Sequence, residues 1–328
     1  METLLLDRAT VEATVDIEDV IEAVEDAFEA YARGDAIMPP KSYIELDEYN
    51  GDFRSMPAYM DAGDWDAAGL KWVNVHPDNP STHNLPTVMG TIIYSDPATA
   101  YPLAIMDGTS VTLLRTGAAA GVATDYLAVE DARSLGIIGA GVQADTQLAA
   151  IAAVRDIKEV VINDVDEEAI DAFIDRFGDR FKIRAGSVEE AAACDVLSTV
   201  TPVTSPIVDL EDVGEHTHIN AMGADAAGKQ ELDPSILQSA MLVIDDYDQC
   251  VHSGEINVPW EAGFLDEADI DAQLGDIVHG SVQGRDASTG ISVFDSTGLA
   301  IQDIATARVA YESANEEGLG DPLDLLRV

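Results

Sequence analysis

Residues 135–144 read L-G-I-I-G-A-G-V-Q-A and are the most informative part of the chain. The apolar run before Gly139 predicts a strand, and the apolar spacing after Ala144 predicts a helix. Gly139 permits a tight turn between them, Gly141 lets a pyrophosphate approach the backbone, and Ala144 keeps the helix close to the sheet. The amides and dipole of a helix N-terminus attract such an anion. The stretch predicts a dinucleotide site; the alternative is a glycine-tight turn without a ligand.

A second predicted strand, at 160–163, indicates which dinucleotide binds. Asp164 follows this strand directly, 25 residues after Gly139. A carboxylate there accepts hydrogen bonds from the ribose 2′-hydroxyl and repels a 2′-phosphate, and residues 165–168 contain no Arg that could hold one. We therefore expect NAD rather than NADP. The residues expected to bind it here are Gly139, Gly141, Val142, Gln143, Asp164 and Asp166.

The charge of the chain is strongly unbalanced. It has 62 acidic and 17 basic residues, for a formal net charge of -45. A nucleic-acid partner requires the opposite sign and is not expected. The acids are spread through periodic apolar segments and 47% of residues are hydrophobic, which indicates a folded protein rather than an acidic tail. Because the Debye length is about 3 Å at 1 M salt, we expect a protein of a high-salt cytoplasm.

The sequence shows no signal for secretion, for a membrane span or for metal binding. No signal peptide is apparent, and no apolar run approaches the roughly 20 residues of a membrane span. Cys194 and Cys250 are isolated, which fits a reducing cytoplasm and gives no zinc motif. His216 and His218 are expected on one face of a strand, without further ligands nearby. We expect a cytoplasmic protein with no membrane contact and no metal.

Basic residues are informative because they are scarce. Lys71 lies in the apolar run G-L-K-W-V-N-V, and Lys229 lies in the loop G-A-D-A-A-G-K-Q-E. Arg54 and Arg115 have similarly unpolar neighbours in F-R-S-M-P-A-Y-M and L-L-R-T-G-A. A cation kept in such surroundings meets an anion or takes part in chemistry. A structural ion pair is the alternative for each of them.

The apolar periodicity changes along the chain. A helix is expected at 15–33, then strands at 41–46, 69–75, 88–95 and 102–107, and an Ala-rich helix at 112–128. After residue 130, strands at 135–138, 160–163, 196–199, 219–222, 241–245 and 292–295 alternate with helices such as 142–154 and 167–177. Such alternation predicts an α/β fold with a doubly wound parallel sheet. A final helix is expected at 300–314, beyond this sheet.

Several blocks together resemble the ornithine cyclodeaminase/mu-crystallin family. They are L-P-T-V-M-G-T-I-I-Y-S-D-P-A-T-A-Y-P-L-A-I-M-D-G (85–108), L-L-R-T-G-A-A-A-G-V-A-T (113–124), G-A-G-V-Q-A (139–144), G-A-D-A-A-G-K-Q-E-L (223–232) and F-D-S-T-G-L-A-I-Q-D (294–303). The resemblance runs from about residue 54 to 311. It implies a Rossmann domain, 115–298, inserted in an α+β substrate-binding and dimerisation domain, 1–114 plus 299–328. It also implies a homodimer.

The resemblance assigns roles position by position. Arg54 is similar to the Arg that grips the substrate carboxylate, and Lys71 to the catalytic acid/base that also contacts the substrate. Arg115 is implied to contact both cofactor and substrate, and Asp225 to activate water or protonate the leaving amine. Ala227 departs from the Pro of many members, which puts the loop shape after Asp225 in doubt. Further cofactor contacts are implied for Thr87, Thr116, Val200, Thr201, Ala221, Met222, Gly223, Lys229 and Ser296, and Leu299 is implied to line the nicotinamide side.

The resemblance also implies a reaction. NAD, a carboxylate-binding Arg and a Lys–Asp pair suit redox chemistry between an amino acid and its 2-oxo acid through an imine. We expect oxidative deamination of L-alanine and reductive amination of pyruvate. Cyclisation of ornithine to proline with recycled NAD, and reduction of imines or ketimines, are the alternatives. A non-catalytic hormone binder is a third, disfavoured by the prokaryote-like halophilic composition.

Overall fold

The computed structural model describes residues 2–326, which form two compact units. Unit 1 comprises Met1–Arg115 and Leu299–Val328, and unit 2 comprises Thr116–Gly298. The boundary falls after Arg115, one residue later than the predicted one. The helix α4 (Gly108–Leu127) runs across this boundary, and it begins four residues before the helix expected at 112–128.

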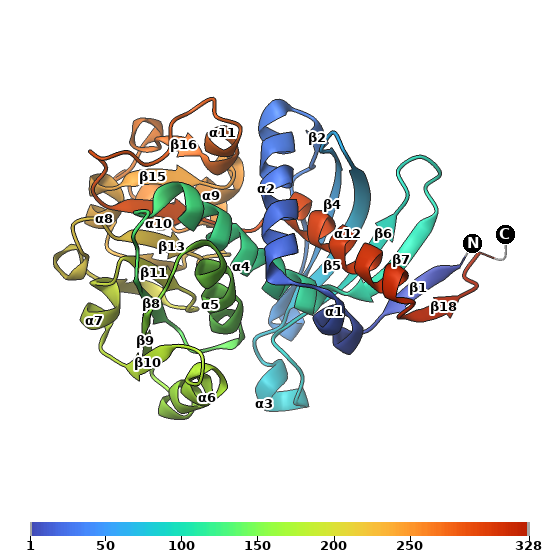
Figure 1. Ribbon diagram of the computed structural model, residues 1–328, viewed down its shortest axis with the longest axis horizontal. Coiled ribbons are helices and arrows are strands. Elements are labelled where there is room, and N and C mark those ends of the chain that lie inside the picture. The colour runs from blue at the N-terminus through green and yellow to red at the C-terminus, as the bar shows by residue number, and fades with distance from the viewer. Residues whose placement is uncertain (1, 327–328) are drawn as a thin grey trace. The chain divides into compact units, whose positions relative to one another are not determined.

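Unit 1 is built on one eight-stranded sheet, ordered β18-β1-β7-β6-β5-β4-β2, with β3 also paired to β4. Neighbouring strands are antiparallel except β1 and β7. Helices α2 and α12 lie side by side on this sheet (Figure 1). The strands are β1 (Thr3–Leu6), β2 (Ala36–Ile37), β3 (Ser42–Leu46), β4 (Gly51–Asp61), β5 (Asp66–Val75), β6 (Val88–Ser95), β7 (Pro102–Asp107) and β18 (Asp321–Leu323). The helices are α1 (Arg8–Thr14), α2 (Ile17–Arg33), α3 (Asn79–His83), α12 (Ala300–Glu317) and the short 3-10 helix η1 (Asp47–Tyr49).

The two faces of this sheet differ in burial. Met56, Lys71 and Ile92 stand opposite one another on β4, β5 and β6, and all three are buried. Helix α12 packs on this face, where a Cβ at Gly69 would lie 2.7 Å from the Ile304 side chain. The alternation of a strand turns the next residues to the other face. That face carries exposed apolar side chains, among them Trp72 and Ile93 at 40% each.

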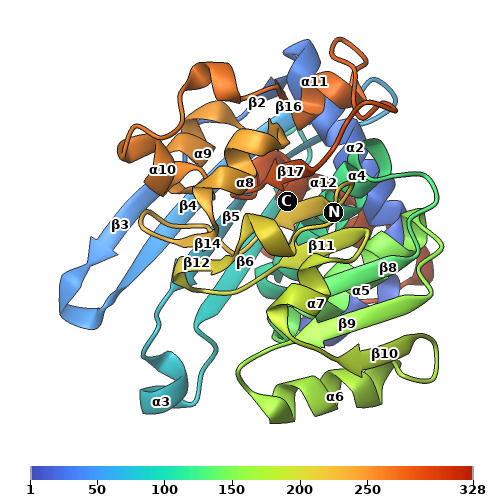
Figure 2. The ribbon, with the colours of Figure 1, turned by 90° about the vertical axis from the view of Figure 1, so that its left-hand side faces the viewer.

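Unit 2 contains a second eight-stranded sheet, ordered β10-β9-β8-β11-β13-β17-β15-β16 and parallel throughout. Figure 2 shows β8 to β11 running side by side with α5, α6 and α7 beside them. The strands are β8 (Ser134–Ile138), β9 (Glu159–Asn163), β10 (Lys182–Ala185), β11 (Val196–Thr199), β13 (His218–Ala221), β15 (Met241–Ile244), β16 (Ala272–Gln273) and β17 (Ser292–Asp295), with β12 (Thr204–Val208) and β14 (Gln230–Leu232) forming a separate pair. The helices are α5 (Val142–Val154), α6 (Glu167–Phe177), α7 (Val188–Ala192), α8 (Pro234–Ser239), α9 (Tyr247–Ser253), α10 (Asn257–Glu261) and α11 (Leu274–Val278), with the 3-10 helices η2 (Leu210–Asp212) and η3 (Glu267–Asp269).

Both faces of this parallel sheet are buried. Val160 and Ile162 pack with Leu148 and Phe173 of α5 and α6. Val161, between them on β9, belongs to the other apolar cluster, which includes residues of α8 and α9. Helices therefore cover both faces, as a doubly wound sheet requires. The predicted Rossmann α/β fold is confirmed. Within residues 2–326, no helix is both long enough and apolar enough to span a bilayer.

Candidate functional site

Three buried charges meet in unit 1. The Lys71 Nζ lies 2.6 Å from Asp303 Oδ2, and the Arg115 Nε lies 3.3 Å from Asp303 Oδ1. Lys71 is 2% exposed and Asp303 fully buried. Strand β5 supplies the lysine, the first half of α4 supplies the arginine, and the first turn of α12 supplies the carboxylate. Two cations share one anion, so the group carries a positive formal charge when Lys71 is protonated.

Burial sets the proton affinity of Lys71. Loss of water lowers its pKa to about 7, Asp303 opposes that shift, and Arg115 adds to it. The Nζ also lies 3.4 Å from the Thr112 Oγ1, which itself donates to the Gly108 carbonyl. An amine that is partly protonated near neutral pH can both give and take a proton. The burial of Lys71 agrees with its apolar sequence context; its catalytic role stays a prediction.

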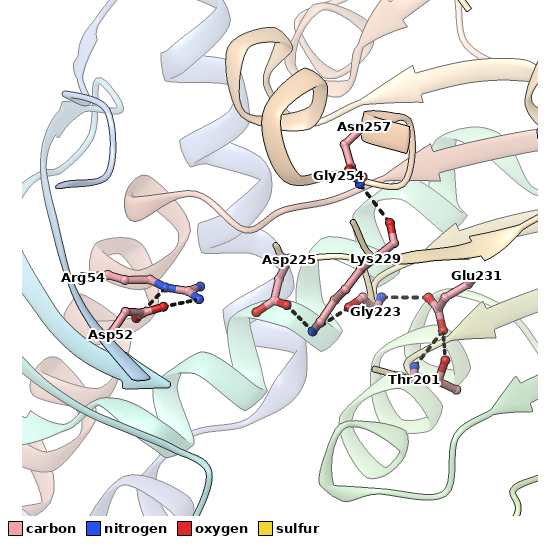
Figure 3. Close-up of polar contacts among 9 residues, drawn as sticks. All are labelled: Asp52, Arg54, Thr201, Gly223, Asp225, Lys229, Glu231, Gly254 and Asn257. Atoms are coloured by element: carbon pink, nitrogen blue, oxygen red, sulfur yellow. Dashed lines mark hydrogen bonds and ion pairs between the residues drawn. The ribbon is translucent and has the colours of Figure 1, made fainter. Parts of the chain in front are cut away.

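Arg54 lies on the same sheet face as Lys71. On β4 it stands opposite Val73, two residues from Lys71 along β5. Its Nε and Nη2 donate to the two oxygens of Asp52, each at 3.0 Å, as Figure 3 shows. The guanidinium also lies 5.4 Å from the centre of the Tyr43 ring. The predicted carboxylate-binding arginine is therefore held in orientation by Asp52, an acid with no predicted role.

The glycine turn between β8 and α5 has the predicted geometry. Gly139 adopts a φ of 106°, which favours glycine, and Ala144 is fully buried. Gly141 caps α5 without a side-chain hydrogen bond, and a Cβ there would meet no atom of the described residues within 4 Å. The amides of a helix N-terminus beside an open backbone are what a pyrophosphate requires. The turn fits the phosphates of a dinucleotide.

Asp164 lies beside this turn, immediately after β9. Its Oδ2 accepts from the Ala140 amide at 2.6 Å, and its Oδ1 accepts from the Asp166 amide at 2.9 Å. Both predicted acids therefore follow the strand neighbouring the glycine turn, where a ribose is held in folds of this class. Val165, between them, is fully exposed.

The remaining candidates of unit 2 gather where parallel strands end. Val200 and Thr201 follow β11, Ala221 ends β13, and Ser296 follows β17. The carboxyl ends of parallel strands form one edge, which is the ligand-binding edge of open α/β sheets. Val142 and Gln143 open α5 at the same edge, and Met222 and Gly223 follow β13 there.

Glu231 clamps two loops of this edge together. Its carboxylate accepts from the Thr201 amide and hydroxyl, each at 2.7 Å, and from the Gly223 amide at 3.0 Å (Figure 3). Burial raises the pKa of Glu231, and the hydrogen bonds from Thr201 oppose that rise. Glu255 in turn accepts from the amides of Glu231 and Leu232. Buried carboxylates that accept backbone hydrogen bonds thus brace the predicted cofactor loops.

Asp225 and Lys229 face one another within their loop. The Lys229 Nζ lies 2.5 Å from Asp225 Oδ1 (Figure 3). Asn257 holds the loop from α10: its Nδ2 donates to the Lys229 carbonyl and its Oδ1 accepts from the Gly228 amide, each at 2.9 Å. Gly228 has a φ of 83° in this loop. The two predicted residues are therefore close together, and Ala227 does not prevent a defined loop.

The expectation for the two histidines was wrong. His218 begins β13, but His216 lies in the preceding turn and is exposed, so they do not share a strand face. His218 contacts Ser292 and Asn220, and burial lowers its pKa to about 3. Among the described residues, no three His, Cys, Asp or Glu side chains are arranged to hold a metal.

The structure therefore groups the candidates in each unit. Lys71 and Arg115 meet in unit 1, and Arg54 lies on the same sheet face as Lys71. Thr87 lies just before β6, apart from these contacts, and its carbonyl accepts from the His76 amide. Thr116 is buried in α4, where its carbonyl accepts from Gln147. Four acids that hold these candidates in place were not predicted from the sequence: Asp52, Asp303, Glu231 and Glu255.

The model of the ornithine cyclodeaminase/mu-crystallin family matches residues 1–318. An alanine dehydrogenase of Archaeoglobus fulgidus is 47% identical over the full length of both chains.

Two solved structures are similar throughout. An archaeal alanine dehydrogenase dimer with bound NAD has 47% identity and a TM-score of 0.94, covering 99% of this chain and 100% of that one. The Δ1-pyrroline-2-carboxylate reductase of Thermococcus litoralis, in complex with NADH and L-proline, has 38% identity and a TM-score of 0.91, covering 97% of this chain and 99% of that one.

Proposed function

Because the chain belongs to the ornithine cyclodeaminase/mu-crystallin family, we propose that it is an NAD-dependent enzyme that interconverts L-alanine and pyruvate. The observation that carries the chemistry is Lys71, buried beside Arg115 and Asp303 with a pKa of about 7. The choice of alanine is supported by the full-length similarity to the Archaeoglobus fulgidus alanine dehydrogenase.

The proposed reaction has two stages: oxidation of the amino acid to an imine, and hydrolysis of that imine. L-alanine, NAD and water give pyruvate, ammonium, NADH and a proton through an imine. The chemistry that NAD supplies is acceptance of the hydride that leaves the α-carbon. Gly139 and Gly141 would hold its pyrophosphate, and Asp164 a ribose hydroxyl.

The chain itself supplies orientation and proton transfer. We assign the substrate carboxylate to Arg54 and Arg115, because guanidinium groups bind carboxylates with defined geometry. Neutral Lys71 takes the proton that the substrate nitrogen must lose, and protonated Lys71 returns it in the reductive direction. We assign activation of water at the imine, or protonation of the leaving amine, to Asp225.

One set of assays tests this proposal. Pyruvate and ammonium should consume NADH and yield an equal amount of alanine, since the hydride ends on the product. With NAD and L-ornithine, a cyclodeaminase would instead form proline without net NADH. Because a relative was solved with NADH and L-proline, a third assay supplies NADH and Δ1-pyrroline-2-carboxylate. Proline formation without alanine formation would contradict the proposal and identify which alternative holds.

The same assays address salt. We propose that the protein works in concentrated salt. With a net charge of -45, its acidic side chains repel one another in dilute buffer and destabilise the folded chain. Activity should rise between about 0.1 M and about 3 M KCl as the Debye length shrinks. Equal activity at both concentrations would contradict a halophilic origin of the acidity.

We further propose a homodimer that uses the open face of the unit 1 sheet. Helices α2 and α12 cover one face, while Trp72 and Ile93 are exposed on the other. Phe53 stacks on Trp72 there, with ring centres 5.2 Å apart. An exposed apolar sheet face of this kind is typical of a protein interface. The mass measured by light scattering in high salt tests it, and a monomer would contradict it.

Asp164 should determine the preference for NAD. Replacing Asp164 with Ser and Val165 with Arg removes the repulsion of a 2′-phosphate and adds a partner for it. Since Val165 is fully exposed, the new arginine meets no packing obstacle. The ratio of kcat/KM for NADPH over NADH should rise by about tenfold or more, equivalent to about 1.4 kcal/mol. A wild type that already prefers NADPH would contradict the assignment.

A further inference from the structure

The buried ion-pair group around Lys71 contains two cations and one carboxylate. Arg115 on α4 and Lys71 on β5 are both cations, and each is less than a tenth exposed. Asp303 on α12 gives one oxygen to each of them, at 3.3 Å and 2.6 Å. In this contact a single carboxylate bridges two like charges, whose mutual repulsion is strengthened by the loss of water on burial.

The first turn of α12 is built to present this carboxylate. Gln302 Oε1 accepts from the Leu299 amide at 3.0 Å, which closes the turn, and also from Arg115 Nη1 at 3.3 Å. Asp303 follows directly, where the amides of a helix N-terminus favour a negative charge. Arg115 is therefore held by two neighbouring residues of α12, and Lys71 by one of them.

We infer that Asp303 is a positioning residue, which fixes Lys71 beside Arg115 and keeps the lysine able to hold a proton in the absence of water. Within the described part of the chain, the charged groups that act most strongly on the lysine are Asp303 on α12, Arg115 on α4 and Lys41 ahead of β3. Asp303 is the one anion among them, and Thr112 is the neutral polar contact. The inference rests on the proposed function only for what the proton is used for.

The test observes Lys71 directly, without turnover. The sequence contains five lysines, so lysine labelled with ¹³C at Cε gives few resonances, and the Lys71→Met variant identifies one of them. In the wild type, this resonance should titrate with a midpoint at about pH 7. In Asp303→Asn, the midpoint should fall by about 1–3 pH units, because an opposite charge at this distance has been removed. An equal or higher midpoint would overturn the inference.

A matched control separates charge from structure. Asp195 accepts hydrogen bonds from the amides of Arg133 and Ser134 and from the Ser134 hydroxyl, all in unit 2. Asp195→Asn should lower the free energy of unfolding but leave the titration midpoint of the Lys71 resonance unchanged. If Asp303→Asn does not fold, Asp303→Glu keeps the charge and should leave the midpoint near that of the wild type. If the midpoint in Asp303→Glu fell as far as the fall predicted for Asp303→Asn, the electrostatic role of Asp303 would be refuted.

Kinetics provide a second readout where the proposed function holds. The limb of the kcat/KM–pH profile that belongs to Lys71 should move to lower pH in Asp303→Asn, whether the lysine gives or takes the proton. Loss of activity with an unmoved limb would reduce Asp303 to a structural residue. Absence of turnover in the wild type would refute the proposed function but leave the NMR result valid.

Discussion

Replacing Lys71 with Met is expected to lower turnover by about 10²-fold or more, because the side chain keeps its bulk but can no longer carry a proton. Asp303 retains Arg115 as its ion-pair partner in this variant, so the buried carboxylate is not left without a cation. The protein should remain folded and should still bind NAD. Steady-state kinetics and a titration with NAD measure the two effects separately.

Lys182 provides the matched control. It lies on β10 with a side chain that is 74% exposed, paired with Glu159 at the surface. Lys182→Met should leave turnover unchanged, because an exposed ion pair of this kind contributes little to the stability of the fold. Near-normal turnover in Lys71→Met would return Lys71 to the role of a structural ion pair.

Replacing Gly136 with Ala is expected to disrupt unit 2. A Cβ at this position of β8 would lie 2.0 Å from the backbone carbonyl oxygen of Ala191, and neither backbone can yield without displacing the strand or α7. Overpacking of a core costs about 1–3 kcal/mol, and a clash between two backbones lies at the upper end. Denaturant unfolding should show the loss, and NAD binding should fall with it.

Gly141→Ala makes the same chemical change five residues later with the opposite outcome. A Cβ there meets no atom of the described residues within 4 Å, and the φ of -76° suits any residue, so stability should be unchanged. NAD affinity should fall by about tenfold, because the methyl group occupies the approach of the pyrophosphate; this corresponds to about 1.4 kcal/mol. Equal NAD affinity in this variant would contradict the assignment of the turn to the cofactor.

The elements that were predicted well have strong local signals. The strands at 88–95, 102–107, 196–199 and 292–295 and the helices at 142–154 and 167–177 have their predicted bounds. Strand β4 was missed, because Pro57 and several polar residues interrupt its pattern. In the structure, β3 pairs with residues 51–55 and β2 with residues 59 and 60 of this strand. Pro57 falls between these two pairings, where a residue without an N–H is tolerated.

The cations of the candidate site could be predicted from the sequence, but the carboxylates that hold them could not. Lysines are scarce in this chain, so Lys71 in an apolar run was conspicuous, and its burial agrees with that context. The carboxylates that hold the predicted residues, Asp303 and Glu231, were hidden among 62 acidic residues. A usable signal existed for Asp303: it ends the block F-D-S-T-G-L-A-I-Q-D, in the first turn of a helix of small apolar residues. Which acid meets which cation depends on tertiary contacts that periodicity does not encode.

The return of α12 to unit 1 sets an order of events during synthesis. Arg115 and Gln302 are separated by 187 positions, and all of unit 2 is translated between them. A ribosome releases unit 2 as one continuous segment, which can complete its parallel sheet while Lys71 still lacks Asp303. Until the last helix emerges, the nascent first sheet exposes the apolar face that α12 will cover. A chaperone that binds exposed apolar sheets should therefore associate with the nascent chain in this interval and leave once α12 has docked.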